Sequence, residues 1–254
     1  MTYLLIAADY TQIELRVLAA LANSKAMLKA FADGEDLHML TAMARFNCGA
    51  DQVTKAMRNF AKRTNFGIPY GLGARGMAEG AKTESMNDEL DDEVRAELAQ
   101  VTLKGCEAFI KAFHETYDGV AEFMEMMKQE ARDKGYVKTF YGRVRHIPDI
   151  RARNRGAREH GEKQAVNLPI TGTAADILKM AIPRVRDAFR SGKMEARLVL
   201  TVHDELTARA PAEEVDTVVE IMARIMPSVA PEIGVEFPVE VRVGETLATL
   251  EEVA

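Results

Sequence analysis

The sequence predicts an α+β protein in which strands from both ends of the chain form one small sheet. An apolar run, Tyr3–Ala8, has the length of a buried strand, and β-rich stretches return near the other end of the chain, at Ala196–Ala210 and Pro238–Gly244. Helical periodicity dominates between them. The expected architecture is therefore a small antiparallel sheet with a largely helical insertion.

The first expected strand places Asp9 at its C-terminal end, where a carboxylate is available for chemistry. Thr11 is positioned to cap the helix that follows over residues 12–22. Helical periodicity then predicts helices over Lys25–Ala32, Asp36–Phe46, Asp51–Asn65, Asp88–Gln100 and Thr102–Lys134.

The last part of the chain mixes hairpins and helices. Residues 135–147 alternate around a Tyr-Gly turn and predict a hairpin. A long helix is expected over residues 158–189, with a bend or break at Pro183. A second hairpin, over residues 196–210, carries acids at its tip, and a helix over 216–226 precedes the last strand.

Composition narrows the class of protein. With 254 residues, 47% hydrophobic and 28% charged, the chain can bury a sizeable core. The apolar run near the N-terminus is far too short to span a membrane and lacks the basic flank of a signal peptide. Cys48 and Cys106 have no metal-ligand spacing. We expect a soluble, cytoplasmic protein with no membrane partner.

Charge is segregated along the chain, although the net charge is -6. Residues 132–163 hold ten Lys or Arg against four Asp or Glu, whereas residues 211–254 hold two against ten. Six arginines fall within residues 143–158, a density that can neutralise several backbone phosphates. The pattern favours a basic surface that follows nucleic acid.

Four residues stand four apart in RNFAKRTNFGIPYG: Arg58, Lys62, Phe66 and Tyr70. On an α-helix this spacing places them along one stripe. Cations pair with phosphate oxygens and rings stack on bases, so the stripe predicts a nucleotide-binding helix. The alternative is a half-exposed surface helix with two core aromatics.

Two acids complete a chemical hypothesis. Phosphoryl transfer is well served by two divalent ions about 3.5–4 Å apart, held by bridging carboxylates. Asp9 and Asp204 are candidates, although either one alone is more commonly a cap or turn residue. The fold must then bring together two residues 195 positions apart.

Three segments carry a family resemblance: DYTQIELR (Asp9–Arg16), RNFAKRTNFGIPYG (Arg58–Gly71) and VHDEL (Val202–Leu206). They resemble motifs A, B and C of the family A DNA polymerases, the bacterial DNA polymerase I group, which implies a bacterial or phage-infected host cell. DGEDLH, GYVKTFYGR, PDI and GTAADILK also fall in family order between them. The resemblance implies palm segments at residues 1–22 and 160–254 and a fingers segment at 23–159.

The resemblance also implies template-directed DNA synthesis and assigns roles to residues. Asp9 and Asp204, with the Tyr10 carbonyl, would bind two Mg²⁺ ions, and Glu205 would be an auxiliary acid. Lys62 would also protonate the departing pyrophosphate. The nucleotide-binding set would be Arg58, Lys62, Phe66, Tyr70, Glu14, His38 and Gln12, in which Glu14 excludes the ribose 2′-OH and so selects deoxynucleotides.

Contacts to primer-template DNA are implied at His203, Asn167, Lys163 and Arg143. Some positions depart from the family pattern. Lys163 stands where the family commonly has Arg, and Thr171 where it commonly has Gln. Pro69 disfavours helix at the preceding residue, so the helix is expected to end there and leave Tyr70 on a turn.

Motif A begins nine residues into the chain, whereas the family places a thumb and part of the palm before it. We therefore expect a second polypeptide to carry these parts, as in a split, phage-encoded polymerase, or the chain to be a truncated product. An uncovered sheet edge would need such a partner.

Two other functions are also compatible with the sequence. A metal-dependent nuclease also uses paired acids, but it needs neither the cationic-aromatic stripe nor a residue that excludes a 2′-OH. A non-catalytic fragment that binds DNA or a partner is the second alternative. The presence of Asp9, Lys62 and Asp204 argues against it.

Overall fold

The computed structural model describes residues 2–46, 48–86 and 92–253. The chain divides into two compact units. The first comprises the chain up to Val17, Thr139–Arg143 and the chain from Ile170 onward; the second comprises Leu18–Lys138 and Val144–Pro169. Within the described residues, no helix is long and apolar enough to cross a membrane.

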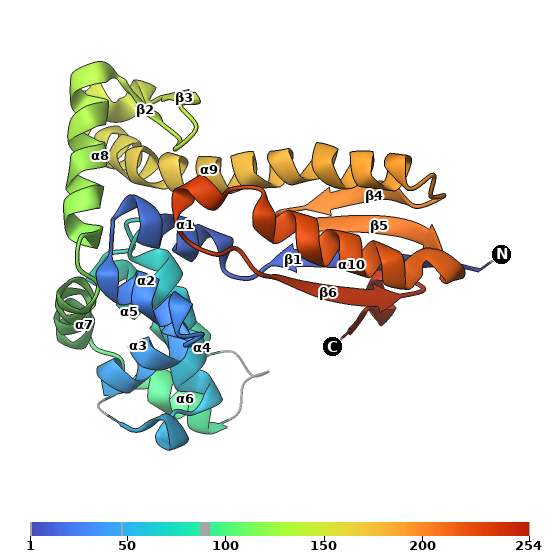
Figure 1. Ribbon diagram of the computed structural model, residues 1–254. Coiled ribbons are helices and arrows are strands. Elements are labelled where there is room, and N and C mark those ends of the chain that lie inside the picture. The colour runs from blue at the N-terminus through green and yellow to red at the C-terminus, as the bar shows by residue number, and fades with distance from the viewer. Residues whose placement is uncertain (1, 47, 87–91, 254) are drawn as a thin grey trace. The chain divides into compact units, whose positions relative to one another are not determined.

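The first unit is built on a five-stranded sheet in which every adjacent pair is antiparallel (Figure 1). The strand order is β4-β5-β1-β6-β7, so the strand from the chain's start lies between strands from its end. This confirms the predicted small antiparallel sheet. The strands are β1 (Tyr3–Tyr10), β4 (Arg197–Val202), β5 (Glu205–Pro211), β6 (Val239–Gly244) and β7 (Glu251–Glu252).

One face of this sheet is covered by helix α10 (Val215–Ile225), which packs against β1, β5 and β6 (Figure 1). Alternate residues of the strands, including Ile6, Leu206 and Val241, are buried there with Met222 of the helix. Burial of such side chains is the main stabilising term of a core. Four 3₁₀ turns complete the unit: η3 (Ala212–Glu214), η4 (Met226–Ser228), η5 (Pro231–Ile233) and η6 (Leu247–Thr249).

The long helix α9 (Arg155–Ser191) contributes its first part to the second unit and its later part to the first. It continues through Pro183, so the expected break does not occur. Proline removes one backbone donor from the helix. Ile177, Ala181 and Val185 are fully buried on either side of it, and their packing holds the helix together.

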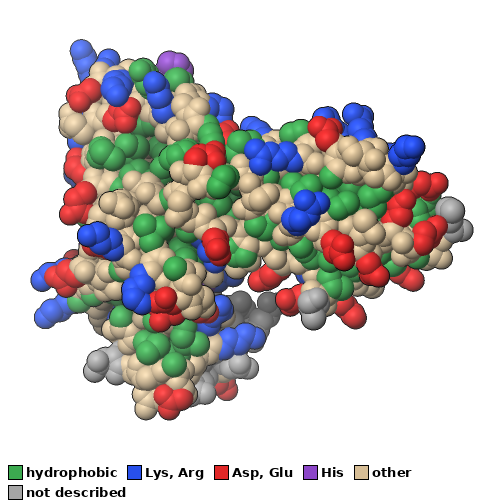
Figure 2. All heavy atoms as spheres, viewed as in Figure 1, with side chains coloured by type: hydrophobic (Ala, Val, Ile, Leu, Met, Phe, Trp, Pro, Cys, Tyr) green, Lys and Arg blue, Asp and Glu red, His purple; other side chains and the backbone are tan. Residues whose placement is uncertain are grey.

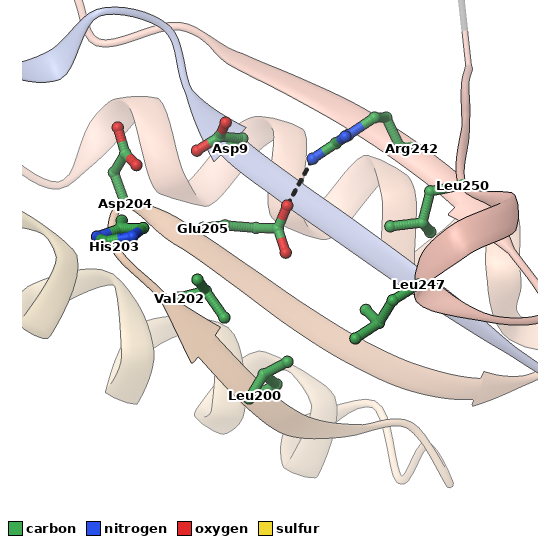
Figure 3. A pocket seen from close by; sticks show the side chains of 9 residues that line it. All are labelled: Asp9, Leu200, Val202, His203, Asp204, Glu205, Arg242, Leu247 and Leu250. Atoms are coloured by element: carbon green, nitrogen blue, oxygen red, sulfur yellow. Dashed lines mark hydrogen bonds and ion pairs between the residues drawn. The ribbon is translucent and has the colours of Figure 1, made fainter.

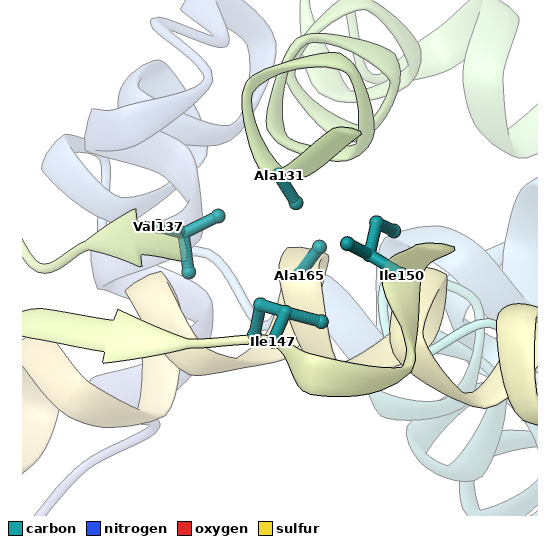
Figure 4. Close-up of a cluster of buried hydrophobic side chains, with 5 residues drawn as sticks. All are labelled: Ala131, Val137, Ile147, Ile150 and Ala165. Carbon is teal, nitrogen blue, oxygen red and sulfur yellow. The ribbon is translucent and has the colours of Figure 1, made fainter. Parts of the chain in front are cut away.

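The second unit is almost entirely helical, with one two-stranded hairpin. A cluster of Ala131, Val137, Ile147, Ile150 and Ala165 joins this hairpin to the long helix (Figure 4). Its elements are α1 (Ile13–Leu21, shared with the first unit), α2 (Lys25–Ala32), α3 (Leu37–Phe46), η1 (Ala50–Gln52), α4 (Lys55–Gly67), α5 (Ala74–Glu84), α6 (Asp92–Ala99), α7 (Leu103–Thr116), α8 (Val120–Lys134), β2 (Tyr136–Lys138), β3 (Val144–His146) and η2 (Pro148–Arg151).

The helix predicted over Thr102–Lys134 is wrong, because the structure has α7 and α8 there. Gly119 separates them with a left-handed φ of 79°. A Cβ at this position would lie 2.2 Å from the Ala22 carbonyl oxygen, so only glycine fits. The break places Asp118 Oδ1 where it accepts from Ser24 Oγ at 3.2 Å and from Ala26 N at 3.1 Å, at the start of α2.

Other helix boundaries also differ from the prediction. Thr11 is not the N-cap of the first helix, because Gln12 takes a left-handed φ of 54° and α1 begins after it. Helix α4 begins only at Lys55, where Thr54 Oγ1 accepts from Met57 N at 3.2 Å. Helix α5 was not predicted. Residues 88–91 of the helix predicted over Asp88–Gln100 lie outside the described residues.

Acidic and basic side chains gather over different elements on the face shown in Figure 2. Asp and Glu side chains gather over α10, and Lys and Arg side chains lie along α9. Both cysteines are free thiols.

Candidate active site

The sheet of the first unit brings the two predicted metal-binding acids together. Asp9 lies opposite Glu205 in the pairing of β1 with β5, and Tyr10 N donates to the Asp204 carbonyl at 3.5 Å. His203 and Asp204 form the two-residue turn between β4 and β5, with His203 at a φ of 53°. Such a tight hairpin turn requires a positive φ. The turn therefore holds Asp204 beside the end of β1.

The Asp9 carboxylate is electrostatically unsatisfied. Burial, together with the negative charges of Asp204 and Glu205, raises the pKa of Asp9 to about 6, and the Arg242 charge opposes this shift. Its Oδ1 is buried and has no hydrogen-bond partner among the described residues. A buried carboxylate oxygen without a donor is a good ligand for a cation.

Glu205 is satisfied, in contrast. Its Oε2 accepts from an Arg242 terminal nitrogen at 2.6 Å, and its Oε1 accepts from Thr207 Oγ1 at 3.0 Å. Glu205 and Arg242 line a pocket of about 300 Å³ with acids at one end and apolar side chains at the other (Figure 3). The pocket is lined by Asp9, Leu200, Val202, His203, Asp204, Glu205, Arg242, Leu247 and Leu250.

The residues present fit a divalent cation, because two carboxylates converge and one has an unpaired buried oxygen. No group of three or more His, Cys, Asp or Glu side chains in the described part of the chain forms a ready-made metal site. Tyr10 is buried, and its hydroxyl donates to the Met226 carbonyl at 2.8 Å, which fixes the main chain next to Asp9.

Two further predicted residues follow directly after β1. The Gln12 Oε1 atom is buried and has no hydrogen-bond partner among the described residues. Glu14 lies in the first turn of α1 and is half-buried. Arg16 fixes this segment, since its Nε donates to the Thr11 carbonyl at 2.9 Å and its Nη1 to the Glu236 carbonyl at 3.0 Å.

In the second unit, Arg58 is anchored by an acid on a neighbouring segment. Its Nε donates to Asp36 Oδ2 at 2.7 Å. Asp36 Oδ1 accepts from His38 N at 2.8 Å and Met39 N at 3.3 Å, at the start of α3. Although burial opposes the shift, the Arg58 and backbone donors hold the pKa of Asp36 below its ordinary value. The pair leaves the terminal nitrogens of Arg58 for other partners.

His38 is buried and neutral. Burial lowers its pKa to about 4, and the Arg58 and Lys62 charges add to this effect against the opposing charge of Asp36. Its Nδ1 lies 3.1 Å from Asn65 Nδ2, which is only a donor, so Nδ1 accepts and Nε2 carries the proton. A neutral His38 can therefore bind a phosphate only as an N–H donor. The Phe66 ring lies 5.7 Å from the imidazole, centroid to centroid.

The cationic-aromatic stripe lies on α4 as predicted for its first three members. The helix ends at Gly67, before Pro69, and Tyr70 lies in the turn that follows, which confirms the expected effect of the proline. Lys62 is exposed, and Arg58 is half-buried.

The four predicted DNA contacts are divided between the units. His203 and Lys163 are exposed, and Asn167 is half-buried with its Oδ1 atom buried. The stem of Lys163 packs against Gly71, where an added Cβ would lie 2.8 Å from Lys163 Cγ. Arg143 instead has internal partners.

The Arg143 guanidinium is bound to the later part of α9. Its Nε donates to Asp176 Oδ1 at 2.8 Å and its Nη2 to the Gly172 carbonyl at 2.8 Å. If Arg143 contacts DNA, it has to do so with guanidinium atoms other than the Nε and Nη2 atoms used in these two contacts.

Sequence reasoning missed three residues that hold the site: Arg242, Asp36 and Asn65. The sequence contains a signal for Asp36, because this residue lies in the family segment DGEDLH and Asp commonly caps a helix. Asn65 lies within the family segment Arg58–Gly71, but its contact with His38, 27 positions away, has no local signal, and neither has the contact of Arg242 with Glu205, 37 positions away.

Comparison with known proteins gives a family. The model of DNA polymerase family A matches residues 1–249. DNA polymerase I of Geobacillus stearothermophilus is 40% identical over 220 residues, 87% of this chain and 23% of the relative. The thermostable DNA polymerase I of Thermus aquaticus is 36% identical over 250 residues, 98% of this chain and 28% of the relative. The chain thus spans about a quarter of the length of these relatives.

A solved structure is also similar. The POL domain of Pol1 from M. smegmatis, in complex with DNA primer-template and dNTP, has a TM-score of 0.83 and 30% sequence identity. The match covers 96% of this chain and 40% of that one.

Proposed function

The chain belongs to DNA polymerase family A, and we propose that it carries out template-directed DNA synthesis, transferring deoxynucleotides from dNTPs to a primer 3′-OH. The observation that carries the proposal is the convergence of Asp9 and Asp204 from opposite ends of the chain, with an unpaired buried carboxylate oxygen on Asp9. In this proposal, residues 1–22 and 160–254 are palm and residues 23–159 are fingers.

Family A DNA polymerases use divalent metal ions. We assign Asp9, Asp204 and the Tyr10 carbonyl as the ligands of two Mg²⁺ ions. Such ions activate the attacking oxygen and stabilise the leaving one. The protein's part is to fix the two carboxylates on adjacent strand ends, where their mutual repulsion favours a bound cation.

The second unit supplies the triphosphate-binding groups in this proposal. Arg58, oriented by Asp36, offers its terminal nitrogens, and His38 offers a neutral Nε2–H. Lys62, exposed on α4, donates a proton to pyrophosphate as it leaves. Phe66 and Tyr70 pack on the sugar and the nascent base pair, and Glu14 with Gln12 selects the deoxyribose.

Primer-template DNA is the second substrate. His203, Asn167, Lys163 and Arg143 are the proposed contacts, and contacts of this kind position the duplex without reading its sequence. The known partner of the M. smegmatis structure, DNA primer-template with dNTP, supports this choice.

A further polypeptide segment is proposed to cover β4. This edge strand exposes Val199, Leu200 and Val202 by 52%, 40% and 44%, and an open apolar edge favours association. A thumb and upstream palm on a second chain would meet this need. Co-elution of such a chain with this one, together with restored primer extension, is the expected result.

The test of the function is extension of a labelled primer on a template, with Mg²⁺ and either all four dNTPs or none. Synthesis predicts lengthened primers that require dNTPs and the templated base. A metal-dependent nuclease would instead shorten the primer without dNTPs. If the chain alone is inactive, the same assay is run with the partner chain, and failure of both to extend the primer would exclude the proposal.

A further inference from the structure

The Arg242 side chain reaches across the central strand of the sheet. Arg242 on β6 lies opposite Ala7 on β1, and Ala7 lies opposite Thr207 on β5. In the adjacent row, Asp9 lies opposite Glu205. Residues directly opposite in antiparallel strands share a face, so the small Ala7 leaves room for Arg242 to reach β5. Figure 3 shows the Arg242 side chain pointing toward Glu205.

Both carboxylate oxygens of Glu205 accept a hydrogen bond within the sheet. One carboxylate oxygen accepts from Arg242 at 2.6 Å, and the other accepts from the buried Thr207 hydroxyl at 3.0 Å. The Glu205 side chain is only 14% exposed. Charge-assisted bonds of this length are among the stronger hydrogen bonds in proteins. Asp9, in the neighbouring row, keeps an unpaired oxygen.

We propose that Arg242 is a positioning residue that withholds Glu205 from cation binding, so that Asp9 and Asp204 hold the cation without Glu205. The proposal rests on the proposed function for its metal site. It deepens that function by naming which of the three clustered acids is excluded and what excludes it.

A consequence follows for a protein without Arg242. Glu205 would lose its charged partner and keep only Thr207, so its carboxylate would be free to turn toward the cation. A carboxylate oxygen that enters the coordination shell of a hard cation replaces a bound water. Loss of Arg242 should therefore add a protein ligand and remove a coordinated water.

The test uses Tb³⁺ as the probe, bound to the full chain without DNA or nucleotide. Its luminescence lifetimes in H₂O and D₂O count the waters on the bound ion. We expect Arg242→Gln to lower this count by about one relative to the wild type. The double variant Arg242→Gln with Glu205→Gln should return to the wild-type count.

Controls separate the contact from a general charge effect. Arg209→Gln removes a different arginine, which lies on β5. The Arg209 guanidinium lies 4.0 Å from the Tyr3 ring centroid and does not line the acidic pocket. It should leave the water count unchanged. Glu205→Gln in the otherwise wild-type protein should also leave it unchanged, because Glu205 is not a ligand there. This variant keeps the test decisive if Arg242→Gln does not fold.

Two outcomes would overturn the proposal on its own. One is an equal water count in the wild type and a folded Arg242→Gln variant, and the other is a gain of water in Glu205→Gln alone. An equal affinity for Tb³⁺ in the wild type and in Asp204→Asn would be a different result. It would contradict the metal site itself and the proposed function with it.

Discussion

The acidic residues of the first unit and the proposed phosphate-binding residues of the second unit differ in how they are held. Asp9 has an unpaired buried oxygen and a raised pKa, because burial and the neighbouring acids both disfavour its charge. Arg58 and His38 instead have dedicated partners, Asp36 and Asn65. Asp9 and Asp204 are thus arranged so that a cation relieves their repulsion, whereas Arg58 and the neutral His38 are oriented before any ligand binds.

The largest expected effect is therefore on the acids. Asp9→Ala and Asp204→Ala should each abolish nucleotide incorporation, a loss of at least about 10³-fold, because neither carboxylate alone provides the two-ion geometry. Single-turnover primer extension measures this, with circular dichroism to check the fold. Asp216→Asn, an exposed acid on α10, is the control. A partial and equal loss at Asp9, Asp204 and Glu205 would contradict the metal assignment.

The next effect tests the cationic helix. Lys62→Ala should lower the incorporation rate about 10²-fold, the usual contribution of a general acid, with a smaller change in nucleotide affinity. Lys55→Ala, an exposed lysine on the same helix, should leave the rate unchanged. Equal losses in both variants would mean that Lys62 contributes only surface charge.

Sugar selection gives a smaller effect. Glu14→Ala should raise incorporation of ribonucleotides relative to deoxynucleotides by about 10–100-fold, because the steric obstacle to the 2′-OH is removed. Phe66→Tyr should raise acceptance of dideoxynucleotides, because Phe66 is proposed to pack on the sugar of the incoming nucleotide. Competition assays with each nucleotide pair give the ratios, and unchanged selectivity in both variants would count against the roles assigned to these residues.

The orientation of Arg58 is tested by Asp36→Asn. This change removes the ion pair at 2.7 Å, so KM for dNTP should rise about fivefold while kcat changes less than twofold. Asp33→Asn breaks an exposed pair with Lys29 and serves as the matched control. A fall in kcat without a change in KM would assign Asp36 to chemistry rather than to positioning.

The features that the sequence predicts correctly are those encoded by local periodicity and by motifs in a fixed order. The sheet from both chain ends, the two hairpins and the stripe on α4 follow from repeats of two and about four residues, which the structure keeps. The end of α4 before Pro69 follows from the missing backbone donor. The resemblance to motifs A and C predicts that Asp9 and Asp204 lie close together, and the sheet brings them together.

What the sequence missed depends on contacts between distant segments. The division of α7 from α8 requires the approach of Gly119 to the Ala22 carbonyl, although the Asp118-Gly119 pair is itself a local turn signal. The anchoring of Glu205 by Arg242 depends on strand register across β1. The burial of His38, which decides that it is neutral, also depends on packing that no single segment encodes.

The smallest expected effect is on the free energy of unfolding. It tests whether the charge of Asp9, unlike that of Arg58, is unfavourable in the protein without a bound ligand. The pKa of Asp9 is about 6 in the folded protein against 3.8 as the ordinary value, so the folded state binds the proton more tightly. Stability therefore rises as pH falls through about 6, and the ionised form is destabilising above it. Asp9→Asn should stabilise the metal-free protein at pH 7.5 by about 1 kcal/mol, a figure reduced for solvent screening of a half-buried group. Urea unfolding in EDTA should show this gain shrinking toward pH 5, while Asp216→Asn shows no such trend. A gain that is the same at both pH values would mean that packing, rather than charge repulsion, sets the stability at Asp9.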